Sequence, residues 1–192
     1  MQIDIIKTLD VTDPVRAQEL VDIYREAFTP HASTSVALQV CYTDASLEQA
    51  LSDPSYIKFI GVIDGQVAGF GLVTDDLAKA KVNLASEEYF KAAFPDAYRE
   101  KRLFYFTAIA VRPTHQGNRV FFDAMASEMT EFIDGRNGSV LFDHSTNTNP
   151  HLPQALEGAI RRSQQKKSLN TSSTKAKMLG AQQYWIIEFT ND

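Results

Sequence analysis

The residues best suited to chemistry form one short segment, VRPTHQGNRV, at positions 111–120. An apolar run precedes it and a stretch with helical spacing follows, which predicts a junction between a strand and a helix. The first turn of a helix has backbone N–H groups without helical partners, and these groups favour a phosphate or another anion. Gly117 permits close approach of the backbone, while Arg112 and Arg119 add positive charge. The segment therefore predicts a site for a diphosphate group.

The same residues also suit a simpler role. Pro113 and Gly117 are typical of a tight turn between a strand and a helix, without any ligand. Arg119 could bind phosphate oxygens directly. It could equally be a solvated residue in the first helical turn, where its charge opposes the helix dipole. The residues alone leave both interpretations open.

Hydrophobic periodicity predicts the elements that must position this segment. Apolar alternation or apolar runs predict strands at 2–8, 56–63, 66–73, 103–111, 139–142 and 183–190. Helical spacing predicts helices at 14–28 with Thr29-Pro30 ending the run, at 46–51 with Asp44 as its cap, at 75–99 with a break at Pro95, at 120–133 and at 153–164. Asp64-Gly65 suits a type I′ hairpin turn, and the run 103–111 suits a central strand buried on both faces. We expect one α/β domain over 1–192, with a helical insert at 74–102.

Composition limits the classes of partner. The 192 residues, 44% of them hydrophobic, suffice for one substantial core. The formal net charge of -5 disfavours nucleic acid and anionic membranes as partners. Cys41 is the single cysteine, so no disulfide framework or multi-cysteine metal site is expected. The N-terminus lacks the pattern of a signal peptide, and no run is long enough to span a membrane. We therefore expect a cytoplasmic protein without a metal.

The apolar strand ending at Val111, followed by Pro113, Gln116-Gly117 and a helix, resembles the acetyl-CoA-binding motif of the GNAT N-acyltransferases. The order of elements agrees over nearly the whole chain. The resemblance implies a mixed, largely antiparallel sheet that splays between its fourth and fifth strands, with helices on both faces. The helical insert would lie between strands three and four. Two loop positions that are small in the family hold Arg119 and Phe121 here, and Phe121 could crowd the diphosphate or shift the helix.

The resemblance also implies the residues that hold acetyl-CoA or another acyl-CoA. The backbone of the fourth strand would hold the pantetheine arm and the thioester, and the loop would hold the diphosphate. These cofactor-binding residues are Ile109, Ala110, Val111, Gln116, Gly117, Asn118, Arg119 and Val120. Arg161, Arg162, Lys166 and Lys167 could meet a 3′-phosphate or could simply complement a helix dipole.

Candidate catalytic residues are His144 and Tyr105. The strand position where the family often has a glutamate base falls at about Tyr105, with Thr107 beside it. His144 follows the next strand, and an imidazole group suits the role of a base, although a solvated strand end explains it too. The family's tyrosine acid has no counterpart, although Asn170, Ser173 and Leu179-Gly180 match part of its motif.

The resemblance implies transfer of an acyl group from acyl-CoA to a primary amine of a small molecule or peptide, by direct attack. Aromatic residues of the insert, Tyr89, Phe90, Phe94 and Tyr98, could line the acceptor pocket or form the insert's own packing face. A homodimer could complete that pocket. The altered loop and the missing glutamate also permit an alternative, a catalytically inactive ligand-binding or regulatory module on the same scaffold.

Overall fold

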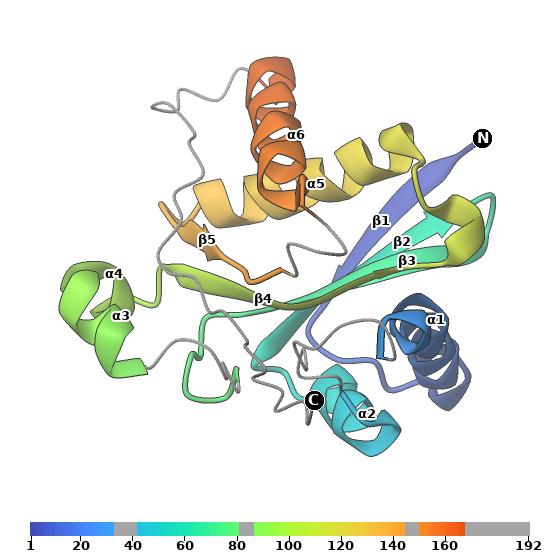
Figure 1. Cartoon of the computed structure of the whole chain (residues 1–192), viewed down its shortest axis with the longest axis horizontal. Helices are drawn as coiled ribbons and strands as arrows, with labels where there is room; N and C mark the ends of the chain where they lie inside the picture. The colour runs from blue at the N-terminus through green and yellow to red at the C-terminus, as the bar shows by residue number, and fades with distance from the viewer. Residues whose placement is uncertain (33–41, 81–86, 145–149, 168–192) are drawn as a thin grey trace, which may run out of the picture.

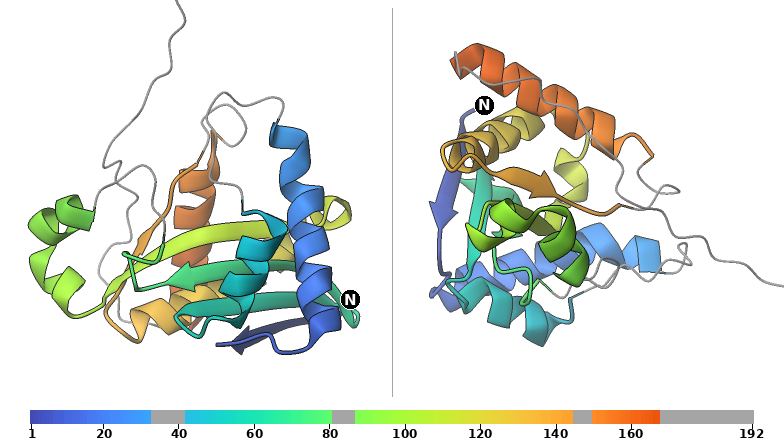
Figure 2. Two further views of the ribbon diagram at one scale, coloured as in Figure 1. Left: turned by 90° about the horizontal axis from the view of Figure 1, so that it is seen from below. Right: turned by 90° about the vertical axis from the view of Figure 1, so that its left-hand side faces the viewer.

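The fold is a five-stranded sheet between two layers of helices, seen in a computed structural model that describes residues 1–32, 42–80, 87–144 and 150–167. Figures 1 and 2 show the sheet between these layers. The strands lie in the order β1 (Ile3–Thr8), β2 (Tyr56–Ile63), β3 (Gln66–Thr74), β4 (Leu103–Val111) and β5 (Ser139–Leu141). Strands β1 to β4 are antiparallel neighbours, and β5 is parallel to β4. The predicted mixed, largely antiparallel sheet is confirmed.

Helices cover both faces of the sheet, as predicted. Helices α1 (Pro14–Ala32) and α2 (Asp44–Ser52) lie on one face, and α5 (Arg119–Asp134) lies on the other with α6 (Leu152–Lys167) against it (Figure 1). Between β3 and β4 come the short helices α3 (Glu87–Ala93) and α4 (Pro95–Arg99), which lie beyond one end of the sheet. This is the expected helical insert.

The tight hairpin between β2 and β3 is formed as predicted. Asp64 and Gly65 have φ values of 47° and 84°, the pair of positive angles that a type I′ turn requires. Every residue of β2 is buried, so this hairpin is the centre of the sheet.

Three helix boundaries differ from the prediction. Helix α1 continues through Pro30 to Ala32, because a proline in the last turn removes only one helical hydrogen bond. Helix α2 is capped by Thr43, whose Oγ1 accepts from the Ser46 N–H at 3.2 Å, so Asp44 is its first residue rather than its cap. The helix predicted at 75–99 is only partly formed, because residues 75–80 form a bend and turns; its predicted break at Pro95 is confirmed, since Pro95 starts a separate helix, α4, whose first turn suits the fixed φ of proline.

The sheet separates beyond the middle of β4. Strand β5 pairs with β4 only from Leu103 to Tyr105, opposite Ser139 to Leu141. Within the described chain, the rest of β4 has no partner on that side, while β3 pairs with it as far as Val111. The expected splay between the fourth and fifth strands is confirmed, and it leaves one backbone edge of β4 open.

A β-bulge lies where the splay begins. Leu72 is opposite Ala108 and Val73 is opposite Phe106, so Thr107 is the extra residue of β4. Because of this extra residue, Tyr105 and Ala108 both face the side of α1 and α2. Ile109 faces α5 instead, with the apolar side chains of that helix.

Some predictions lie outside the described residues: the strand at 183–190, Cys41, and the partial motif at Asn170, Ser173 and Leu179-Gly180. In the part of the chain that is described, no helix is long and apolar enough to cross a membrane.

Candidate functional site

The junction after β4 has the local geometry of an anion site. Pro113–His115 form one turn of 3₁₀ helix, and Gly117 then adopts φ +78° before Asn118 caps α5. A Cβ at position 117 would meet nothing within 4 Å. Glycine is therefore required there by the left-handed backbone rather than by crowding.

The Asn118 side chain satisfies part of the helix start. Its Oδ1 accepts from the Phe121 N–H at 3.1 Å, and its carbonyl accepts from the Phe122 N–H at 3.0 Å. Among the described residues, no group accepts from the amides of Gly117, Arg119 and Val120. These three N–H groups are the ones that an anion at this helix terminus would meet.

Phe121 leaves the loop open. Its side chain is 2% exposed and points into the core beneath α5, where its ring lies over Gly61 of β2. The expectation that this residue could crowd a diphosphate is wrong, because the first turn of α5 directs it toward the sheet.

The two arginines of the junction have different surroundings. Arg112 points toward α1: its Nε donates to the Val67 carbonyl at 2.9 Å, and its guanidinium pairs with Glu26 at 3.1 Å and Glu19 at 3.4 Å. The expectation that Arg112 adds free positive charge to the loop is therefore wrong. The Arg119 side chain is 74% exposed and its Nε lies 3.8 Å from Asp123.

Helix α6 brings a further cation to the same helix end. Arg162 donates to both carboxylate oxygens of Asp123, at 2.6 and 3.2 Å. Asp123 thus lies between Arg119 and Arg162, and the cluster keeps a net positive charge beside the open amides.

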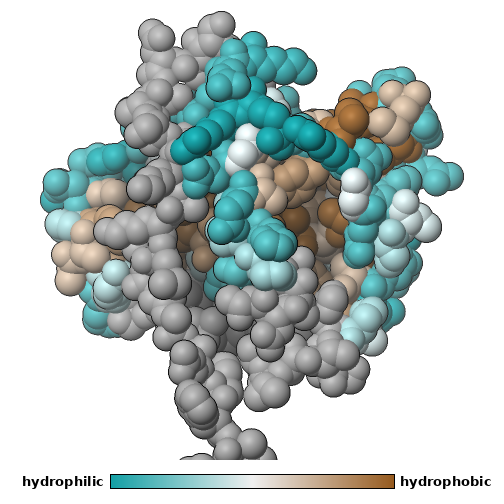
Figure 3. All heavy atoms as spheres, turned by 45° about the horizontal axis from the view of Figure 1, so that its top comes forward, coloured by the Kyte–Doolittle hydropathy of each residue, from teal (hydrophilic) through white to brown (hydrophobic). Residues whose placement is uncertain are grey.

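One face of the molecule is hollowed. Figure 3 shows hydrophobic side chains gathered in a hollow that hydrophilic side chains surround. Half-buried apolar residues on the α5 side of the splay include Ile109, Val111 and Phe142. Ala110, in contrast, is 1% exposed and offers only its backbone.

A carboxylate and a phenol meet across the splay. The Tyr105 hydroxyl of β4 donates to Oδ1 of Asp143, which follows β5. Burial, and then this hydrogen bond, raises the pKa of Tyr105. Because a carboxylate only accepts, the single phenolic proton is directed at Asp143.

Further hydroxyl groups surround the bulge. Tyr42 interacts electrostatically with the hydroxyl groups of Thr107 and Tyr56, and the Tyr56 hydroxyl donates to the Lys79 carbonyl at 2.7 Å. Burial raises the pKa of Tyr42 and of Tyr56, so both phenols are neutral at neutral pH. We call Tyr42, Tyr56, Tyr105 and Thr107 the hydroxyl cluster.

Solved structures share this arrangement of elements. An aminoglycoside acetyltransferase from an uncultured soil metagenomic sample aligns with a TM-score of 0.51 and 11% identity, over 97% of each chain; it was solved with trehalose and with sisomicin. A ribosomal-protein-alanine N-acetyltransferase from Escherichia coli aligns with a TM-score of 0.52 and 12% identity, over 83% of this chain and 76% of that one. The chain has the GNAT fold. No protein-family model and no curated protein matches the sequence.

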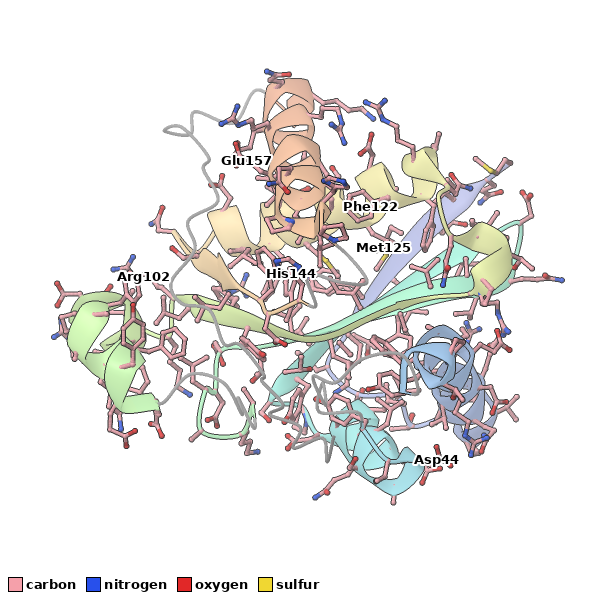
Figure 4. All side chains as sticks on the ribbon, in the orientation of Figure 1. Asp44, Arg102, Phe122, Met125, His144 and Glu157 are labelled. Atoms are coloured by element: carbon pink, nitrogen blue, oxygen red, sulfur yellow. The ribbon has the colours of Figure 1, made fainter. Side chains whose placement is uncertain are left out.

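In the GNAT fold of this chain, the two candidate catalytic residues lie on opposite faces. Tyr105 packs with Leu141 toward the insert. His144 has its ring 6.3 Å from that of Phe142, which belongs to the α5 side. Figure 4 shows His144 on the side of β4 that α5 and α6 cover, toward Met125. Side chains after β5 point alternately to the two faces, and this places His144 on the face opposite Tyr105.

The aromatic residues of the insert mostly pack on one another. Phe90 is 3% exposed, and Phe94 and Tyr98 lie against the same cluster as Leu103 and Tyr105, whereas Tyr89 is 41% exposed. Only Tyr89 presents a large exposed aromatic surface.

Sequence reasoning missed Asp143, Tyr42 and Tyr56. Asp143 is adjacent to His144 in the sequence, but only the strand register shows which of the two meets Tyr105. Among the described residues, no group of histidine, cysteine and carboxylate side chains could hold a metal ion.

Proposed function

We propose that this protein is an N-acyltransferase that moves an acetyl or other acyl group from acyl-CoA to a primary amine by direct attack. One observation carries the proposal: within the described part of the chain, the amides of Gly117, Arg119 and Val120 are open at the end of β4, and Phe121 is turned away from them. A helix start with open amides, beside a strand with a free edge, suits a ligand that has a diphosphate group and an extended arm.

The cofactor-binding residues divide by their part in this site. The free edge of β4 at Ile109, Ala110 and Val111 would pair with the amide groups of the arm, as a neighbouring strand would. The loop residues Gln116, Gly117, Asn118, Arg119 and Val120 would hold the diphosphate. Gln116 supports the loop, since its Nε2 donates to the Val111 carbonyl at 3.2 Å.

The amine acceptor would enter from the splay. The similar soil enzyme is an aminoglycoside acetyltransferase and the similar Escherichia coli enzyme acts on a ribosomal protein, so both small-molecule and peptide amines are candidate acceptors. Tyr105 and His144, the catalytic residues expected from the sequence, lie at the strand ends, one on each face.

The experiment combines binding with turnover. CoA at about 100 times its dissociation constant should stabilise the fold by about 2.7 kcal/mol, seen as a rise in melting temperature. Acetyl-CoA with a panel of primary amines should release free thiol. Absence of any CoA-induced shift contradicts the proposal. Stabilisation by CoA without thiol release from any amine supports the inactive-module alternative instead.

A further inference from the structure

We infer that Asp143 accepts the proton from the attacking amine and that Tyr105 is its positioning residue. This inference rests on the proposed acyl transfer. Neither the strand pattern nor the resemblance assigned this role to Asp143; they indicated Tyr105 on the fourth strand and His144 after the fifth.

The two strands place the carboxylate across the splay. Tyr105 is opposite Leu141 in the last paired position of β4 and β5, and Asp143 follows two residues later on the same face as Leu141. The Tyr105 hydroxyl donates to Asp143 Oδ1. Among the described residues, nothing donates to Oδ2, so that oxygen is available to a substrate.

The direction of this hydrogen bond decides which residue is the base. Tyr105 is 8% exposed and gives its only proton to Asp143, so it cannot accept a proton while that bond stands. Asp143 is exposed and, as a carboxylate, can accept one. Tyr105 therefore fixes the rotamer of Asp143 rather than reacting.

The position along β4 suits the reacting end of an acyl-CoA. The open amides lie beyond Val111, and the bulge at Thr107 lies about 13 Å back along the strand at 3.3 Å per residue. An extended arm that starts at the amides and follows the free edge of β4 would bring its far end to the bulge. Asp143 and the hydroxyl cluster lie at that end.

Among the described residues, Asp143 is the carboxylate that accepts a hydrogen bond from the hydroxyl cluster. Tyr42, Tyr56 and Tyr105 have raised pKa values and act as neutral donors. His144 lies on the α5 side with Phe142. An amine approaching from the side of α1 and α2 therefore meets a carboxylate and several hydroxyl groups.

In the proposed transfer, one C–N bond forms and one C–S bond breaks. The lone pair of the neutral amine forms a C–N bond to the thioester carbon, and the C–S bond breaks with its electron pair on sulfur. Asp143 takes the proton that the nitrogen loses and later releases it to water. The thiolate takes a proton from water. The products are the amide and CoA.

The test measures turnover and CoA affinity in matched variants. With acetyl-CoA and whichever panel amine gives most thiol, Asp143→Asn should lower kcat by about 100-fold or more, the range of a lost general base. Tyr105→Phe should lower kcat by roughly 10-fold, because the carboxylate remains but is less well placed. CoA affinity should stay within about twofold in both variants, which also verifies that they fold. Asp96→Asn, on exposed α4, is the matched control and should keep full activity.

Two further measurements separate catalysis from structure. Formate added to Asp143→Ala should restore part of the turnover, which a purely structural role would not allow. Independently of activity, the drop in melting temperature of a Tyr105→Phe and Asp143→Asn double variant should be smaller than the sum of the two single drops.

The outcomes distinguish the two proposals. Activity that survives Asp143→Asn but is lost in His144→Ala overturns this inference, keeps the acyltransferase function and makes His144 the base. Additive melting-temperature drops overturn the positioning role of Tyr105. Absence of thiol release with every amine overturns both the proposed function and this inference.

Discussion

The ring of Phe121 occupies the space into which a side chain at position 61 would project: a Cβ on Gly61 would lie 2.3 Å from the ring. This contact fixes the start of α5 against β2 and turns the largest residue of the loop region away from the open amides. Because Gly61 has no side chain, Phe121 can stay buried against β2, and this keeps the loop before α5 open.

Gly61→Ala should destabilise the fold by about 1–3 kcal/mol and weaken CoA binding, because a rigid ring must move from beneath α5. Gly71→Ala is the matched control: its Cβ would meet the flexible end of Met129, which can shift at little cost. Urea unfolding and CoA-induced melting shifts measure both effects. Equal behaviour of the two variants would contradict the role of Phe121.

Gly117 offers a test of charge alone. Both Gly117→Asn and Gly117→Asp place a side chain on a left-handed backbone, where these two residue types are tolerated better than others. We expect Asp to reduce CoA affinity by about 10-fold more than Asn does, because only Asp repels a diphosphate. Calorimetric titration with CoA measures the difference, and identical affinities would place the diphosphate elsewhere.

Arg119 should contribute to binding while Arg112 contributes to stability. Arg119→Gln should weaken CoA binding by roughly 3- to 10-fold, or about 0.7–1.4 kcal/mol, and should reduce its salt dependence. Arg112→Gln should leave CoA affinity unchanged and lower the melting temperature, since it loses Glu19, Glu26 and the Val67 carbonyl. The reverse pattern would show that the loop binds its anion through Arg112.

Asp53 should make part of the stability depend on acid pH. A hydrogen bond from the Ser55 backbone, and then the Lys79 ammonium, lowers the pKa of Asp53 from 3.8 to about 2. A lowered folded-state pKa gives stability that is present above pH about 4 and lost as the pH falls toward 2. In urea unfolding, the advantage of the native chain over Asp53→Asn should therefore be larger at pH 6 than at pH 3. Lys79→Met should keep most of this dependence; a pH-independent advantage would contradict the assignment.

The sequence by itself determined the parts of the fold that depend on local backbone chemistry. Asp64-Gly65 required a hairpin because only a few residue types accept two positive φ angles in succession. The almost wholly apolar run of β4 predicted a strand with apolar neighbours on both faces. Gly117 and Asn118 lie between a strand and an amphipathic stretch, and this pattern predicted a helix start with open amides. Such a feature can be predicted from sequence because its amides belong to residues that are close together in the chain.

Tertiary structure decided which side chains meet at the site. Tyr105 and Asp143 are 38 positions apart, and Arg112 and Glu19 are 93 apart, so neither contact is visible in a local pattern. The extra residue at Thr107 reverses the faces of the following strand positions, and a side-chain period of two cannot reveal such a shift in advance. The sequence could thus predict an anion site at the end of β4, but the register of β4 against β3 and β5 determines which carboxylate faces the splay.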